Sequence, residues 1–187
     1  MSLVELLGRA DERGLAASAV ACIDRCLALL DDGEAADPAL LRPLWAGADS
    51  GADWGTLVAA ARAAVADGTS AATAATAASA GDDATADDEL TRLLADMAVR
   101  APSAYSEAEL RAWAGACSDA ALEIHRRLDG GAEGVSPLTA GELRRQTQIL
   151  EALAEGRGAG LRKALDLSTE GRRVLRAAVS RRARAQR

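Results

Sequence analysis

The sequence has almost none of the residues that build β-sheets. Among its 187 residues there are no Phe, three Trp, one Tyr, three Ile and eight Val, so aromatic residues make up only 2% of the chain. Strands favour β-branched and aromatic side chains, and too few are present to form an ordinary sheet. The composition therefore excludes a β-rich fold.

Cysteines and long apolar runs are also scarce, and each absence excludes a class of protein. Three cysteines are an odd number at low density, which argues against the disulfide framework of a secreted domain. No run of 18 apolar residues occurs, so no membrane span and no membrane partner are expected. Residues 1–5 lack a basic region before an apolar run, so we expect no signal peptide. Together these features predict a cytoplasmic protein with reduced thiols.

Alanine and leucine dominate what is present, with 47 Ala and 25 Leu. Both are strong helix formers. We therefore predict an all-α fold, a compact helical bundle of about six to eight helices. Because an alanine side chain buries little area, we expect closely packed helices in place of a thick aromatic core. The bias towards residues with GC-rich codons, and the absence of Asn, indicate a bacterial source.

Capping patterns and apolar periodicity locate the helices. A Ser or Thr followed three residues later by Glu is typical of a helix start, and this capping box occurs at Ser2, Ser106 and Thr139. Asp37 and Pro38 predict the start of a brief helix that Pro43 limits. Apolar residues at helical spacing predict the remaining helices, over residues 15–30, about 53–65, 88–99 and 161–184.

The same periodicity predicts which side chains face the core. Trp113 and Cys117 share the apolar face of the helix that follows Ser106, and Leu143, Leu150 and Leu153 are expected to face inward on the next helix. Trp45 and Trp54 are predicted core residues, with exposed interface anchors as the alternative.

Residues 68–88 form the stretch of lowest complexity, made only of Ala, Thr, Ser, Gly and Asp. Since this stretch has nothing large to bury, we predict a linker or loosely held loop, with a helix extended over 71–80 as the alternative. The chain would then consist of an N-terminal helical part over 1–67, the loop, and a C-terminal helical part over 89–187, together forming one composite domain.

Charge is distributed unevenly along the chain. Residues 1–156 carry 12 Arg and 26 acidic residues, a net charge of −14, whereas residues 157–187 carry ten basic and two acidic residues, a net charge of +8. No acidic residue follows Gly171. This polarity has three interpretations: cations that complement a helix C-terminus, an arm that binds nucleic acid, or an arm that binds an acidic partner or the chain's own acidic body.

We expect a non-enzymatic interaction or regulatory protein that binds an acidic protein partner through helix faces and this basic C-terminal arm. Arginine suits such contacts because its guanidinium binds carboxylates in a bidentate manner. The predicted partner-binding residues are Arg172, Arg173, Arg176, Arg181, Arg182 and Arg184. Nucleic-acid binding through the same helix is the alternative, although the acidic body repels phosphate and the arm has no aromatic residue to stack on bases. Assembly of the chain into a homo-oligomer is a further hypothesis.

A third hypothesis concerns the soft metal ligands Cys22, Cys26, Cys117 and His125. Spacings of four and eight residues place each pair on one side of a helix, and a bundle could join the two pairs in a tetrahedral metal site or a ligand site. Free cysteines more often behave as small buried apolar residues. We therefore predict no metal, no cofactor and no catalytic residue.

Overall fold

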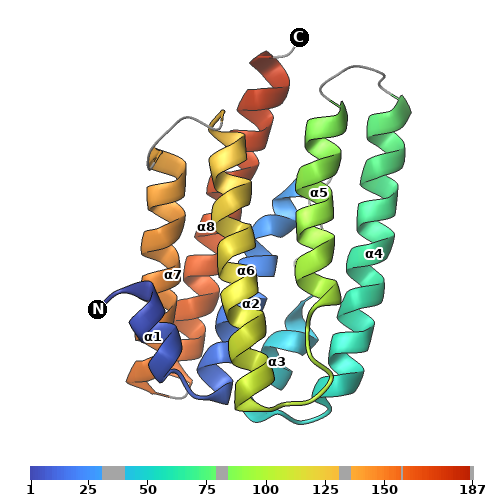
Figure 1. Cartoon of the computed structure of the whole chain (residues 1–187). Helices are drawn as coiled ribbons and strands as arrows, with labels where there is room; N and C mark the ends of the chain where they lie inside the picture. The colour runs from blue at the N-terminus through green and yellow to red at the C-terminus, as the bar shows by residue number, and fades with distance from the viewer. Residues whose placement is uncertain (31–40, 79–83, 131–135, 157, 186–187) are drawn as a thin grey trace.

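A computed structural model describes residues 1–30, 41–78, 84–130, 136–156 and 158–185 of the chain. These residues form eight α-helices and one short 3-10 helix, with no strand among them (Figure 1). The all-α prediction and the predicted number of helices are confirmed. None of the helices in these segments combines the length and the apolar composition needed to cross a membrane.

The helices follow one another along the chain in a simple order. They are α1 (Leu3–Arg9), α2 (Glu12–Cys26), the 3-10 helix η1 (Leu27–Leu30), α3 (Arg42–Ser50), α4 (Trp54–Ala78), α5 (Ala84–Val99), α6 (Glu107–Leu128), α7 (Pro137–Glu155) and α8 (Ala159–Ala185). α4 and α5 lie side by side along one edge of the bundle, and α7 and α8 lie along the opposite side (Figure 1).

α2 is the central helix of the bundle. It contacts α3, α5, α6, α7 and α8, and each of its residues from Arg13 to Cys26 is buried. Alanines such as Ala16, Ala17 and Ala21 allow neighbouring helices to approach α2 from all sides, as expected for close packing of small side chains.

The aromatic residues belong to the core. Trp54 stacks edge-on against Tyr105 and Trp113, with ring centroids 5.4 and 5.9 Å apart. The indole N–H of Trp54 donates to the carbonyl of Pro102 and that of Trp113 to the carbonyl of Met97. Trp45 is also buried, so the core prediction holds for all three tryptophans.

Helix covers most of the stretch predicted as a loop. α4 continues to Ala78 and α5 begins at Ala84, so the loop prediction was wrong for residues 68–78 and 84–88. The small side chains of this stretch favour helix, and Thr69 and Ala72 are buried. Residues 79–83 lie outside the described residues. The division of the chain into parts at this stretch stays a prediction.

The helix starts agree only in part with the capping boxes. At Ser2 the box is complete, since Ser2 Oγ accepts from the amide of Glu5 and Glu5 accepts from the amide of Ser2. Ser106 caps α6 without a side-chain hydrogen bond. α7 begins at Pro137 instead of near Thr139, because Ser136 accepts from the Thr139 amide and a proline suits the first helical position.

The proline signals predicted for the brief helix have different outcomes. Pro43 lies in the first turn of α3 and does not end it. Asp37 and Pro38 lie outside the described residues. α8 begins at Ala159 and continues through Gly171 as one helix.

Candidate functional site

The structure buries all four candidate metal ligands but does not bring them together as a metal site. Cys22, Cys26 and Cys117 are free thiols, and His125 has no exposed surface. No group of three or more His, Cys, Asp or Glu side chains in the described segments is placed to hold a metal ion. Burial raises the pKa of Cys22 to about 11 and those of Cys26 and Cys117 well above 9.0. These thiols are therefore protonated at neutral pH and are poor nucleophiles.

A buried ion pair between α2 and α7 is the most unusual feature of the core. Arg25 and Glu142 have no exposed side-chain surface. Arg25 Nε donates to both carboxylate oxygens at 3.1 and 3.0 Å, and Arg25 Nη2 donates to Oε1 at 2.6 Å. Burial alone would raise the pKa of Glu142, but the Arg25 guanidinium lowers it to about 2. Glu142 is therefore ionised in the core at neutral pH.

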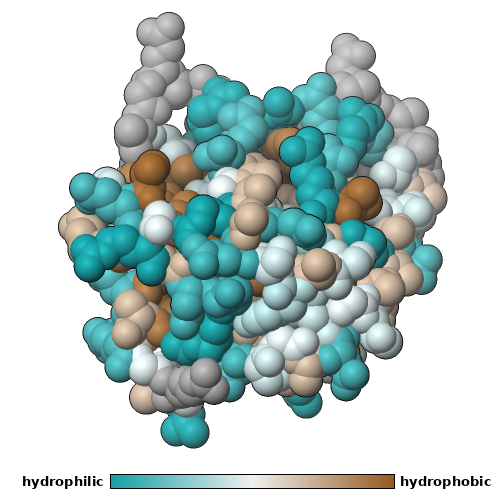
Figure 2. Space-filling model, turned by 60° about the horizontal axis from the view of Figure 1, so that its bottom comes forward, coloured by the Kyte–Doolittle hydropathy of each residue, from teal (hydrophilic) through white to brown (hydrophobic). Residues whose placement is uncertain are grey.

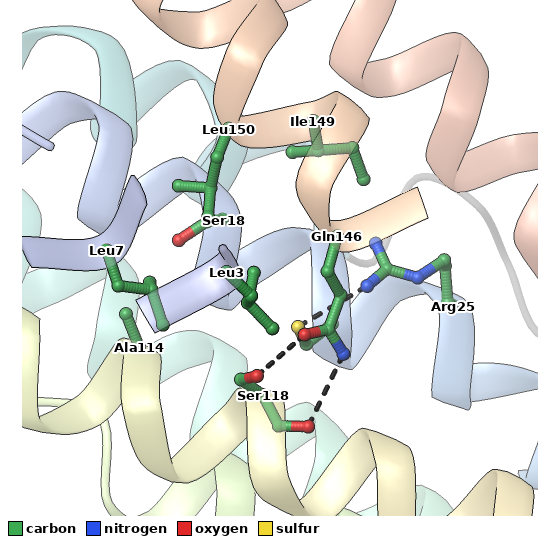
Figure 3. Close-up of a pocket in the computed structure, with 10 residues that line it drawn as sticks. Leu3, Leu7, Ser18, Arg25, Ala114, Ser118, Gln146, Ile149 and Leu150 are labelled. Carbon is green, nitrogen blue, oxygen red and sulfur yellow. Dashed lines mark hydrogen bonds between the residues drawn. The ribbon is translucent and has the colours of Figure 1, made fainter. Parts of the chain in front are cut away.

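Polar side chains from four helices complete the hydrogen bonding of this pair. On the carboxylate side, Gln146 Nε2 donates to Glu142 Oε1, and Gln146 Oε1 accepts from the hydroxyl of Ser118 on α6 at 2.6 Å (Figure 3). On the guanidinium side, Arg25 donates to Ser168 Oγ on α8 and to Cys22 Sγ. The network joins α2, α6, α7 and α8.

Gly171 of α8 makes room for Arg25. A Cβ atom at this position would lie 2.3 Å from Arg25 Cδ, so only glycine fits against the guanidinium stem without displacing it. Gly171 therefore serves the close packing of α8 against α2.

Sequence reasoning missed this network because its polar members interrupt the apolar pattern. Glu142 was assigned to a capping box and Leu143 to the core, but Glu142 is buried and Leu143 is 39% exposed. Glu142, Gln146, Ile149 and Leu153 repeat at helical spacing and lie buried together on α7. This helical spacing, which continues from Glu142 and Gln146 into two apolar residues, was the signal in the sequence that could have placed Glu142 on the buried face of α7.

A small cavity lies next to this network, beneath α1. Leu3 and Leu7 of α1 close one side of it, and Gln146 and Ser118 line the other side (Figure 3). Its volume is about 10 Å³, which is about the space of one water molecule. The cavity is too small for an organic ligand or a substrate.

No protein family, no curated protein and no solved structure matches the chain. Its own geometry is therefore the basis for any functional proposal.

The predicted partner-binding arginines of α8 divide into two groups. Arg172 bonds to Asp24 of α2, and these side chains are only 11% and 4% exposed. Burial raises the pKa of Asp24, although Arg172 opposes this shift. Arg182 is half-buried and donates to the carbonyl of Arg127 at the end of α6. Arg176 is also half-buried. Arg172, Arg176 and Arg182 therefore lie against the bundle.

The other three predicted arginines face solvent. Arg173, Arg181 and Arg184 are exposed, whereas Leu175 and Ala178 between them are buried. α8 is thus an integral helix of the bundle with a cationic outer face.

Proposed function

We propose that the chain is an interaction protein that binds an acidic protein partner through Arg173, Arg181 and Arg184 of α8. The observation that supports this proposal is the two-sided character of α8. Its inner face is fixed by buried Ser168, Gly171, Leu175 and Ala178, while its outer face carries exposed guanidinium groups. A rigid helix presents charges with little loss of conformational freedom on binding.

The spacing of the three arginines suits an elongated acidic surface. Arg173 and Arg184 are 11 residues apart, about three helical turns, so they lie near one line along α8 and are separated by roughly 16 Å. Arg181 lies about 80° round the helix from Arg173. Glu170 lies 3.8 Å from Arg173 in an exposed pair that solvent screens strongly. These arginines can therefore exchange local contacts for carboxylates of a partner.

The visible surface offers little support for an apolar interface. In Figure 2 the hydrophobic residues occur in separate patches among hydrophilic ones. Among the described residues the large apolar side chains that are exposed are Met1, Val4, Val99, Leu143 and Leu165. Charge is therefore the stronger basis for partner binding.

A triple variant tests the proposal. Arg173→Gln/Arg181→Gln/Arg184→Gln removes three exposed charges and leaves the inner face of α8 unchanged. The matched control, Arg42→Gln/Arg144→Gln/Arg162→Gln, removes three exposed arginines from α3, α7 and the start of α8. The binding of each protein is measured to poly-glutamate, the acidic probe, and to random-sequence duplex DNA, the nucleic-acid probe. Both measurements are made at low and moderate salt.

We expect the first variant to bind poly-glutamate at least roughly tenfold more weakly than the wild type, and the control to bind nearly as well, since charge-assisted hydrogen bonds are local. Equal losses of poly-glutamate affinity in the two triple variants would show only an effect of net charge and would contradict the proposal. Tighter binding to duplex DNA, with a steep salt dependence, would support the nucleic-acid alternative.

A further inference from the structure

His125, the only histidine of the chain, is fully buried beside the Arg25–Glu142 pair. Its Nδ1 lies 2.7 Å from the carbonyl oxygen of Ala121. Because a carbonyl accepts and never donates, Nδ1 carries a hydrogen. Its Nε2 lies 3.5 Å from Glu142 Oε2 and has no hydrogen-bond partner.

Neither protonation state of His125 suits this environment fully. In the neutral ring the lone pair of Nε2 faces a carboxylate oxygen, so two acceptors meet with no hydrogen between them. In the charged ring the Nε2–H group gains Glu142 as a partner, but a second cation then enters the interior next to Arg25. A buried cation without a partner of its own is costly.

The charged groups around His125 come from several helices. α2 contributes Arg25, and α7 contributes Glu142 and Arg145. Arg145 has one buried guanidinium nitrogen, Nη1, without a hydrogen-bond partner.

The neighbouring helices add charges that are already paired. α8 contributes Arg172, which is paired with Asp24 of α2. Glu89 of α5 and Glu123 of α6 are both paired with Arg127 near the end of α6. Burial lowers the pKa of His125 below its ordinary 6.5, and Arg25 and Arg145 act in the same direction, against the attraction of Glu142.

We propose that His125 is an acid-sensitive latch that holds the N-terminal half of α7 on the bundle. When His125 takes up a proton, one carboxylate must balance the buried cations His125 and Arg25. When residues 137–146 separate from α2 and α6, water reaches His125, Arg25 and Glu142. The two cations are then no longer buried with a single carboxylate between them. α7 is the element that yields because it lies at the side of the bundle, whereas α2 is enclosed by its neighbours (Figure 1).

The size of the effect follows from proton linkage. In the opened form His125 is solvated and has its ordinary pKa of 6.5, whereas in the closed form its pKa is lower. The equilibrium constant for opening therefore rises by up to roughly tenfold for each pH unit below 6.5, until the pKa of the closed form is reached. Glu142, with a pKa of about 2, stays ionised through this range.

Hydrogen exchange and NMR on the full chain test the latch. The single imidazole gives one Cε1–H resonance, which reports the protonation of His125 directly. Amide exchange over 137–146, corrected for the intrinsic pH dependence, should accelerate as the pH falls below 6.5 and should level off where the ring resonance titrates. In His125→Gln, which cannot titrate, the acceleration should vanish.

A second variant keeps the proposal testable if His125→Gln does not fold. Arg145→Gln removes a repelling charge, so the ring should titrate at higher pH and the acceleration of α7 exchange should level off at that higher pH. Glu123→Gln, whose carboxylate lies on the outer side of α6 and bonds to Arg126 and Arg127, should shift neither. The proposal is overturned if α7 exchange stays constant with pH, if it does not follow the ring titration in Arg145→Gln, or if it persists in a folded His125→Gln.

Discussion

Replacing Arg25 with Met isolates the contribution of the buried ion pair. The variant leaves the Glu142 carboxylate in the core with Gln146 as its hydrogen-bond donor. Removal of one partner of a buried pair typically costs about 3–5 kcal/mol. The pKa of Glu142 gives a consistent magnitude, because a lowering from 4.5 to about 2 corresponds to about 3 kcal/mol.

Urea unfolding at neutral pH, followed by the fluorescence of the buried tryptophans, measures this loss. For a chain of this size, about 3–5 kcal/mol lowers Tm by roughly 6–20 °C. The double variant Arg25→Met/Glu142→Leu replaces the pair with apolar side chains and should recover most of the lost stability. The losses of unfolding free energy in Arg25→Met and in Glu142→Leu should therefore not add up in the double variant.

Glu123→Gln is the matched control for burial. The pKa of Glu123 is also about 2, lowered by hydrogen bonds from Arg126 and Arg127. Since this cluster is exposed to solvent, its removal should cost far less than the loss of Arg25. Similar losses in the two variants, or losses that simply add in the Arg25/Glu142 double variant, would refute the reasoning.

The same assay at low pH has a defined sign. The pKa of Glu142 is lower in the folded protein than in the unfolded chain, so its contribution to stability is complete above pH 4.5 and is lost as the pH falls towards about 2. In Arg25→Met this part of the pH dependence should shrink, because the cation that lowers the pKa is absent.

Three further outcomes follow from the packing. Arg172→Gln should lower the unfolding free energy by about 1–3 kcal/mol because it leaves the buried Asp24 carboxylate without its cation, whereas Arg173→Gln should leave urea unfolding unchanged. Gly171→Ala should destabilise the protein by about 1–2 kcal/mol, since the new Cβ meets Arg25; a gain of stability, as for glycine at an open helix site, would contradict this. The three cysteines should react with a thiol reagent only on unfolding, and rapid reaction in the native protein would contradict their burial.

Much of the fold could be predicted because helix formation is largely local. The Ser2 capping box, the core position of Trp113 and the dominance of Ala and Leu each depend on residues within a few positions along the chain. The error over residues 68–78 has a definite cause. Small side chains were taken as a sign of weak packing, but next to α5 they allow α4 to continue as a helix with Thr69 and Ala72 buried.

The candidate site was much less predictable. Arg173, Arg181 and Arg184 could be found as charges, but nothing in the sequence separated them from Arg172, whose partner Asp24 lies 148 residues away. Polar side chains such as Glu142 and Gln146 usually lie at the surface. The cation that allows Glu142 to be buried lies on another helix.

The sequence by itself determined that this chain is helical, where several of its helices begin, and how its charges are divided along its length. These properties depend on propensity, capping and composition, which act between near neighbours. Only the tertiary structure decided which charges are buried. Burial of Arg25, Glu142 and His125 depends on which helices meet, over separations such as the 117 residues between Arg25 and Glu142, and on a glycine at position 171 that leaves room for the guanidinium.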